Sequence, residues 1–167
     1  DDRSCSINLS GQSLADEGFL EFVIDCLDHS QIAPGRICFE ISETAVMDRV
    51  DQARRFIGVL HGMGCQFGLD DFGSGLGSFT TLRDLSIDYL KIDGSYTHDL
   101  KPEGLNHQLV SAITGMSRIL GFRVVAEQVE AQGDFEALRT IGVDFIQGNF
   151  VDPPHRLGEA GGGMTVH

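Results

Sequence analysis

Side chains suited to metal binding and proton transfer recur along this 167-residue sequence, each at or near the end of an apolar run. Carboxylate and amide oxygens suit hard divalent cations such as Mg²⁺ and Mn²⁺ better than they suit zinc. The candidate oxygen ligands are Asn8, Glu40, Asp70, Asp71 and Glu127. Carboxylates packed so closely would repel one another or protonate unless cations neutralised them. We therefore predict a site for two Mg²⁺ or Mn²⁺ ions, which can clamp the attacking and leaving oxygens of a phosphodiester.

One cation accompanies these acids. Lys91 lies in the fourth apolar run, where it could orient the attacking water or stabilise charge on phosphoryl oxygens. Glu127 could ligate a metal or act as a base toward water. The strongest local motif is Asp70–Gly75, in which two acids precede a glycine-rich turn that can swing over a site. We expect the catalytic residues to be Lys91, Glu127 and Asp71.

The elements that carry these residues follow a repeating strand-and-helix pattern. Short apolar runs alternate with segments of helical periodicity, which predicts parallel strands joined by helical crossovers. The expected strands are Cys5–Leu9, Ile37–Ile41, Cys65–Leu69, Tyr89–Ile92, Phe122–Ala126 and Phe145–Val151. Polar residues at the carboxyl ends of buried strands are costly unless they are used, and in barrels that end holds the active site. We predict an α/β fold, a TIM-like (β/α) barrel. The alternative, an open doubly wound sheet, is less favoured because no GxGxxG motif follows the first strand.

Periodicity also predicts which helical faces are buried. The expected apolar stripes are Phe19, Phe22, Val23, Cys26 and Leu27 in one helix, and Leu105, Leu109, Ile113, Met116 and Leu120 in another. Glycines at 64 and 121 fall just past helix ends, where a positive φ is wanted. All four cysteines lie in apolar runs without metal-ligand spacing, so buried free thiols are expected, as suits a reducing cytosol.

The amino-acid composition excludes some classes of binding partner. The chain has 12 basic and 25 acidic residues, a formal net charge of −13, which argues against nucleic acid or an anionic membrane as partner. Neither a signal peptide nor an apolar run of membrane-spanning length is present, so we expect a cytoplasmic segment without direct membrane contact. A membrane anchor elsewhere in a longer parent protein is compatible with this expectation.

Six ordered motifs make the sequence resemble one known family. They read SINLS, FEISET, LDDFGSG, YLKID, VVAEQVE and IQGNF, from Ser6 to Phe150. They are similar to the NLS, ExTE, DDFGTG, KID, AEGVE and QGY patterns of the EAL domain. The resemblance implies a barrel that hydrolyses cyclic di-GMP to linear pGpG with Mg²⁺ or Mn²⁺. It also implies homodimers and, in the parent chain, an upstream GGDEF or sensor domain.

The resemblance assigns roles to the residues that match each motif. Asn8, Glu40 and Asp70 match ligands of the first metal, whereas Asp70, Asp71 and Glu127 match ligands of the second. Lys91 matches the lysine that positions the water. Four residues are expected to bind substrate or support the ligands: Gln147, Glu130, Asp93 and Glu43. Among these, Glu43 matches the acid thought to hold the DDFGTG loop.

Departures from the family patterns are equally specific. Gln128 replaces the glycine of AEGVE, and it strains that turn if the position needs a positive φ. Gly94 stands where a basic residue usually follows KID, Asn149 replaces an aromatic residue, and Ser42 and Ser74 replace threonines. The EAL string itself is absent, so we expect residues 1–155 to be a partial domain lacking its N-terminal barrel units, with 156–167 as a flexible tail.

These departures leave more than one function open. A degenerate EAL domain that binds cyclic di-GMP as a receptor, without cutting it, is the alternative to the phosphodiesterase. Retention of Glu40, Asp70 and Lys91 favours the enzyme, whereas Gln128 and the missing EAL glutamate favour the receptor. An enolase-like lyase is a weaker alternative, because the DDFG and NLS motifs have no role there. By itself the 167-residue chain is expected to be a poor enzyme.

Overall fold

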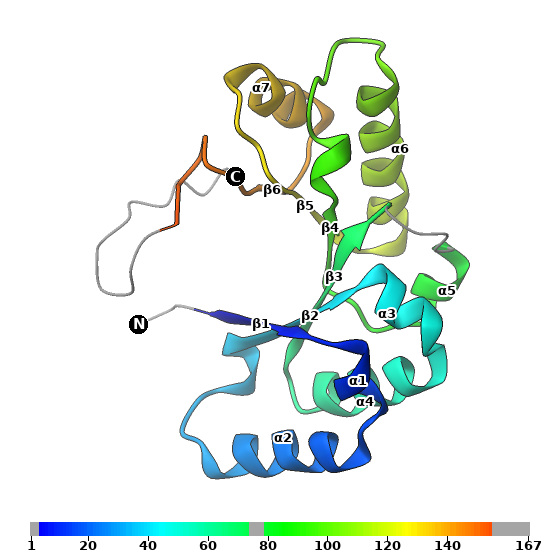
Figure 1. The fold of residues 1–167 in the computed structure, drawn as a ribbon, viewed down its shortest axis with the longest axis vertical. Coiled ribbons are helices and arrows are strands. Elements are labelled where there is room, and N and C mark those ends of the chain that lie inside the picture. The colour runs from blue at the N-terminus through cyan, green and yellow to red at the C-terminus, as the bar shows by residue number, and fades with distance from the viewer. Residues whose placement is uncertain (1–3, 74–78, 155–167) are drawn as a thin grey trace. The chain divides into compact units, whose positions relative to one another are not determined.

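The computed structural model describes residues 4–73 and 79–154. The chain divides into two compact units, Asp1–Asp88 and Tyr89–His167, and each is built from parallel strands with helices between them (Figure 1). Ser74 and Gly75 of the glycine-rich motif, and the tail after 154, lie outside the described residues.

The first unit contains a parallel sheet in which β2 pairs with both β1 and β3. Its elements are β1 (Cys5–Leu9), α1 (Gly11–Ala15), α2 (Glu17–His29), η1 (Pro34–Arg36), β2 (Ile37–Ser42), α3 (Glu43–Asp48), α4 (Val50–Gly62), β3 (Gln66–Phe72) and α5 (Phe79–Arg83). Ser10, Asp16 and Ser42 begin α1, α2 and α3, and each side chain accepts a hydrogen bond from a first-turn N–H. Ser10 and Ser42 therefore turn the chain from a strand into a helix, and Asp16 separates α1 from α2.

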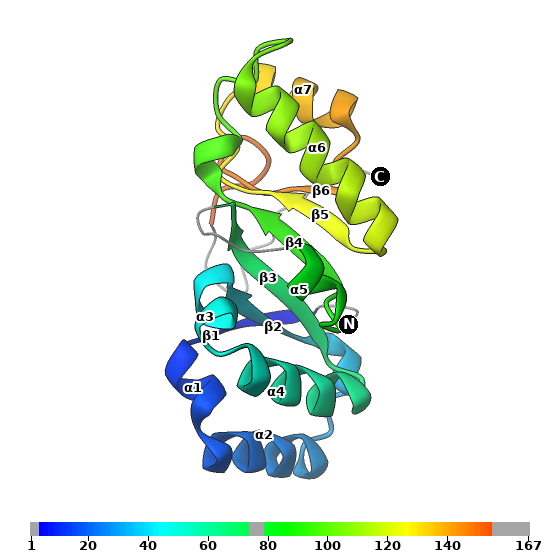
Figure 2. The ribbon, with the colours of Figure 1, turned by 90° about the vertical axis from the view of Figure 1, so that its right-hand side faces the viewer.

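Aromatic side chains form the core of this unit. Phe39 of β2, Phe56 of α4 and Phe67 of β3 are almost fully buried, and their ring centroids lie 5.5 to 6.4 Å apart. The Phe19 ring of α2 stacks on Phe56 with centroids 6.1 Å apart. Figure 2 shows α4 beside the strands and α2 beyond it. The outward faces of β2 and β3 are thus held by helices, which fixes the residues on their opposite faces.

The second unit repeats the pattern, with β5 pairing in parallel with both β4 and β6. Its elements are β4 (Tyr89–Ile92), η2 (Gly94–Tyr96), α6 (Leu105–Leu120), β5 (Arg123–Ala126), α7 (Gln132–Ile141) and β6 (Phe145–Ile146). Gly121 and Gly142 end α6 and α7 at φ 85° and 83°, a left-handed conformation that costs glycine little. The prediction for Gly121 is confirmed, and Gly64 likewise has φ 102°.

Four predicted strands have different limits, two of them by a single residue at one end. β3 continues to Phe72, so Asp70 and Asp71 lie within the strand rather than after it. β6 stops at Ile146, so Gln147 lies just beyond a strand that was predicted to reach Val151. The chain turns there, because the Val151 and Asp152 N–H groups both donate to Gly148 O.

The predicted helical stripes are partly wrong. In α2 the buried residues include Leu20, whereas Phe22 is 60% exposed. In α6 the buried side is Val110, Thr114 and Ser117, and Leu105 is 73% exposed. Apolar residues cover a wider arc of each helix than the contact with the sheet needs, so periodicity alone selected the wrong edge of that arc.

The cysteine prediction also holds only in part. All four thiols are free, but only Cys38 and Cys65 are buried, whereas Cys5 and Cys26 are exposed. Cys5 lies on β1, which pairs with β2 within the described residues and is exposed along most of its length. Over the part of the chain that the structure describes, no helix is both long and apolar enough to cross a membrane.

Candidate active site

Three of the predicted oxygen ligands share one face of the sheet in the first unit. Asn8 of β1 is in register with Glu40 of β2, and Glu40 with Gly68 of β3. Asp70 lies two residues beyond Gly68, so the alternation of side chains along a strand puts it on the same face. Glu40 is 9% exposed, whereas Asn8 is exposed. The sheet register therefore brings an amide and two carboxylates to one side of the strand ends.

Asp71 is displaced from this row by its backbone. Its φ of 54° is left-handed, which is uncommon for a non-glycine residue and more tolerated by aspartate than by most. The Asp71 N–H donates to Asp70 Oδ1 at 3.0 Å, so the two acids are held as a local pair. A conformation of this kind is costly and is often kept at functional sites.

Glu43 is buried beneath the start of the glycine-rich motif. It opens α3 with 1% exposure, and its Oε2 accepts a hydrogen bond from the Gly73 N–H at 2.8 Å. A hydrogen bond from a backbone N–H to a charged carboxylate is stronger than one between two neutral groups. Glu43 thereby ties the residue after Phe72 to the first turn of α3. This position suits the predicted role of Glu43, which is to hold the glycine-rich loop.

The second unit contributes a buried ion pair. Lys91 lies in β4 and Glu127 follows β5, and the Lys91 Nζ is 2.7 Å from Glu127 Oε1. Their side chains are only 8% and 13% exposed. Burying two charges is expensive, so the pair needs close geometry to be retained. It places a cation and an acid together at the carboxyl ends of adjacent strands, where barrel enzymes carry their chemistry.

The remaining predicted residues of this unit separate into two groups. Glu127, Glu130 and Gln147 line one pocket of about 180 Å³, so the structure brings these three together. Gln147 is held there by its backbone, whose N–H donates to Ala126 O at 2.8 Å. Asp93 instead caps η2, where its Oδ1 accepts from the Ser95 N–H at 2.8 Å. Its structural role is to turn the chain after β4.

Thr97 is a contributor that the sequence analysis missed. Its side chain is fully buried, and its Oγ1 lies 2.6 Å from Glu127 O and 3.0 Å from Gly94 O. The hydroxyl thus ties the peptide after Glu127 to the η2 turn. No sequence signal distinguishes this threonine, because its partner is 30 residues away and is a backbone atom.

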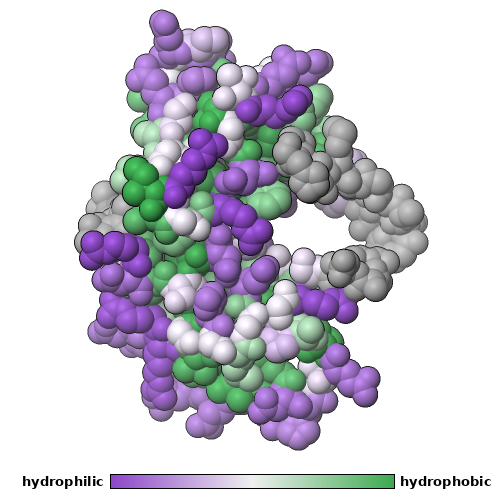
Figure 3. All heavy atoms as spheres, turned by 180° about the vertical axis from the view of Figure 1, so that it is seen from behind, coloured by the Kyte–Doolittle hydropathy of each residue, from purple (hydrophilic) through white to green (hydrophobic). Residues whose placement is uncertain are grey.

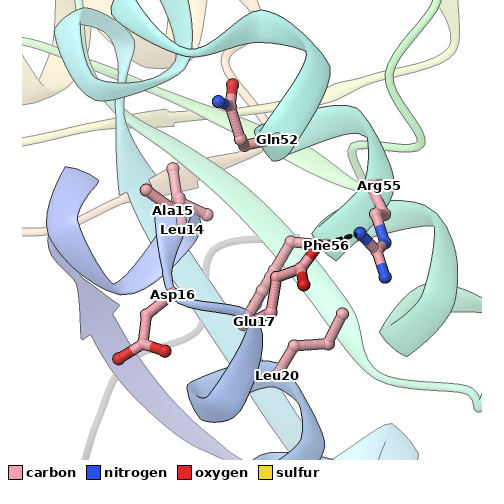
Figure 4. A pocket seen from close by; sticks show the side chains of 8 residues that line it. All are labelled: Leu14, Ala15, Asp16, Glu17, Leu20, Gln52, Arg55 and Phe56. Atoms are coloured by element: carbon pink, nitrogen blue, oxygen red, sulfur yellow. Dashed lines mark hydrogen bonds and ion pairs between the residues drawn. The ribbon is translucent and has the colours of Figure 1, made fainter.

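Two other hollows lie in the first unit, and none of the predicted metal ligands lines either of them. One, of about 220 Å³, lies between α1, α2 and α4, where the exposed Arg55 and Glu17 form an ion pair at 2.6 Å (Figure 4). The other, of about 340 Å³, is almost wholly apolar and includes Ile7, Phe22 and Ile32. Figure 3 shows apolar surface exposed on the part of the molecule that holds α2. The second hollow lacks the polar groups of a phosphodiester site, and the first holds Arg55 and Glu17 in an ion pair with each other.

Parallel βα units with carboxylates, an amide and a buried lysine at strand ends are typical of (β/α) enzymes, and these side chains could supply oxygen ligands to a divalent cation. The model of the EAL domain family matches residues 1–154. This chain belongs to the EAL domain family.

Curated relatives agree with this membership. The chain is 37% identical over 156 residues to "Cyclic di-GMP phosphodiesterase PdeB" of Shewanella oneidensis, covering 93% of the chain and 18% of that protein. It is 35% identical over 152 residues to "Cyclic di-GMP phosphodiesterase PdeF" of Escherichia coli, covering 91% and 20%. The chain therefore spans about a fifth of the length of these relatives.

Solved structures confirm the predicted fold class, since EAL domains are TIM-like barrels. "PaMucR Phosphodiesterase, c-di-GMP complex" matches with a TM-score of 0.83 and 30% identity, over 87% of this chain and 65% of that one. The c-di-GMP-bound EAL domain of FimX from Pseudomonas aeruginosa matches with a TM-score of 0.85 and 26% identity, over 90% and 62%.

Proposed function

We propose that this chain carries the catalytic residues of a phosphodiesterase that hydrolyses cyclic di-GMP to linear pGpG with Mg²⁺ or Mn²⁺. The observation that carries the proposal is the buried pair of Lys91 and Glu127 at adjacent strand ends. A domain that only bound a ligand would need few of these residues, whereas hydrolysis uses an ammonium and a carboxylate together. Relatives named as cyclic di-GMP phosphodiesterases support the substrate.

The residues of the chain suit divalent cations. Asn8, Glu40 and Asp70 would hold one ion, and Asp70, Asp71 and Glu127 a second, with oxygen donors throughout. Bound there, the ions supply Lewis-acid activation of the phosphodiester and of water. Lys91 would orient the attacking water through its Nζ, and Glu127 would fix that ammonium from the side. Gln147 and Glu130 line the same pocket as Glu127, where they would contact substrate.

A cyclic di-GMP receptor without turnover is the second candidate. It is favoured by Gln128, whose φ of 54° occupies a turn where the family pattern has glycine. The FimX match, a structure described as bound to c-di-GMP, shows that binding occurs in this fold. The two candidates differ in one measurable respect, because only the enzyme releases pGpG.

The setting of the domain is also proposed. We expect cytoplasmic homodimers, regulated by a GGDEF or sensor domain in the parent chain. Support comes from a Pseudomonas aeruginosa relative, 30% identical over 153 residues, named as a bifunctional diguanylate cyclase and cyclic di-GMP phosphodiesterase.

The deciding experiment follows pGpG release by the full-length protein with Mn²⁺ and with excess EDTA. We expect turnover that EDTA abolishes and that Ca²⁺ inhibits, because the larger ion coordinates more loosely. Lys91→Ala should lower kcat by about 10²-fold with KM nearly unchanged. The matched control is Lys101→Ala, which removes an exposed lysine paired with Asp99 at 2.9 Å.

Each alternative outcome has a defined meaning. Tight binding of cyclic di-GMP with no pGpG would support the receptor. A raised KM with unchanged kcat in Lys91→Ala would make Lys91 a binding residue. Full activity in EDTA would contradict the metal requirement.

A further inference from the structure

The two departures from the family pattern at Gly94 and Gln128 meet at one contact in the second unit. Gly94 begins η2 after β4, and Gln128 follows Glu127 at the end of β5. A Cβ built on Gly94 would lie 2.5 Å from Gln128 Oε1 and 2.9 Å from Gln128 Cβ, closer than real Cβ atoms approach. The Gln128 side chain therefore fills the space that a side chain at position 94 would need.

Space, rather than backbone conformation, explains the glycine at 94. Its φ lies outside the left-handed region, so other residues could adopt its backbone. Gln128 is the converse case, because its φ of 54° would suit glycine better than a residue with a side chain. In the family patterns, glycine occupies the strained position and a larger residue follows KID. In this chain the two are swapped, with Gln128 at the strained position and Gly94 after KID.

The contact lies against the peptide that carries Glu127. The buried Thr97 hydroxyl has a single proton, which it can donate to Glu127 O or to Gly94 O. Glu127 N–H approaches Ile92 O at 3.4 Å, and Glu127 Oε1 is 2.7 Å from Lys91 Nζ. A steric clash between a side chain at position 94 and Gln128 would therefore shift the Glu127 peptide, and with it the carboxylate beside Lys91.

We propose that Gln128 is a positioning residue, which packs over Gly94 and thereby sets the Glu127 carboxylate against Lys91. The inference deepens the proposed phosphodiesterase function and rests on it for the role of Glu127. It also makes the two substitutions interdependent, because a side chain at position 94 is compatible only with glycine at position 128.

The test is a double-mutant cycle in the full-length protein, with Gly94→Ala introduced into the wild type and into Gln128→Gly. In the wild type we expect Gly94→Ala to lower kcat by about tenfold or more and to weaken Mn²⁺ binding, measured by calorimetry, with KM within about twofold. In the Gln128→Gly background the same change should alter kcat and Mn²⁺ affinity by less than about twofold. Gly133→Ala is the matched control, because a Cβ there meets no atom within 4 Å.

Two results would overturn the proposal. One is equal loss from Gly94→Ala in both backgrounds, which would show that Gln128 isn't the obstructing group. The other is a loss confined to melting temperature, with kcat, KM and Mn²⁺ affinity unchanged, which would leave the contact structural. If the wild type released no pGpG, the proposed function would fail, yet Mn²⁺ affinity across the cycle would still decide whether positions 94 and 128 position Glu127.

Discussion

Replacing Lys91 with methionine tests how strongly the Lys91–Glu127 pair shapes the domain. The change keeps the bulk of the side chain and removes its charge, leaving Glu127 in a site where its side chain is 13% exposed. Removing one partner of a buried pair typically costs about 3–5 kcal/mol, because the other charge stays buried and uncompensated. Partial access of Glu127 to water places the expected loss at the lower end, about 3 kcal/mol.

The double variant Lys91→Met with Glu127→Gln distinguishes two causes of lost stability in Lys91→Met, the uncompensated Glu127 charge and the loss of packing. The Glu127 charge is removed together with that of Lys91, so the unfolding free energy of the double variant should lie within about 1 kcal/mol of the wild type. Urea unfolding followed by far-UV circular dichroism suits this chain, which has no tryptophan and two tyrosines. EDTA is needed, because a bound divalent cation would itself neutralise Glu127 and stabilise the folded state.

A small loss of unfolding free energy in Lys91→Met would refute this reasoning. If Lys91→Met cost less than about 1 kcal/mol in EDTA, then Glu127 would be able to reach water without Lys91, and the pair would not be buried in the sense used above. Lys101→Met is the matched control, since the Lys101 side chain is 75% exposed and should cost nearly nothing.

Two further predictions concern other parts of the chain. Glu43→Gln should lower stability by about 1 kcal/mol, measured by urea unfolding, because it replaces the charged acceptor of the Gly73 N–H with a neutral amide oxygen in a site with 1% exposure; an unchanged unfolding midpoint would contradict this, and Glu136→Gln at an exposed position of α7 is the control. Alkylation by iodoacetamide, read by mass spectrometry, should label Cys5 and Cys26 quickly and leave the buried thiols slow. Burial raises the pKa of Cys65, so its thiolate fraction at a given pH is lowered and its labelling should accelerate only toward alkaline pH; rapid labelling at neutral pH would mean that the segment between α4 and β3 opens to solvent.

Strand positions followed from sequence to within a few residues, because each strand is a short apolar run bounded by polar or glycine residues. Cys5–Leu9 and Tyr89–Ile92 match the observed strands at both ends. Phe145–Val151 does not, since Phe150 and Val151 extend the apolar pattern beyond Gly148, where backbone hydrogen bonds turn the chain. Apolar character indicates where a strand can form, but hydrogen bonds decide where it stops.

The helical faces were harder to predict, for a related reason. Both edges of α2 and α6 are apolar, and only packing against neighbouring elements decides which edge is buried. Phe22 and Leu105 are exposed, although their spacing is as regular as that of the buried residues. The hydrophobic pattern fixes a direction only to within the width of the apolar arc.

By itself, the sequence determined the residue types of the site, the parallel βα repeat and the family, because motif letters and periodicity are local properties. Only the tertiary structure decided which side chains meet. It put Glu127 2.7 Å from Lys91, gave Thr97 a bond to the Glu127 carbonyl, and packed Gln128 over Gly94. The partners in the last two contacts lie 30 or more residues apart in the chain. Contacts of this kind depend on how strands align in three dimensions, and no spacing within one motif encodes them.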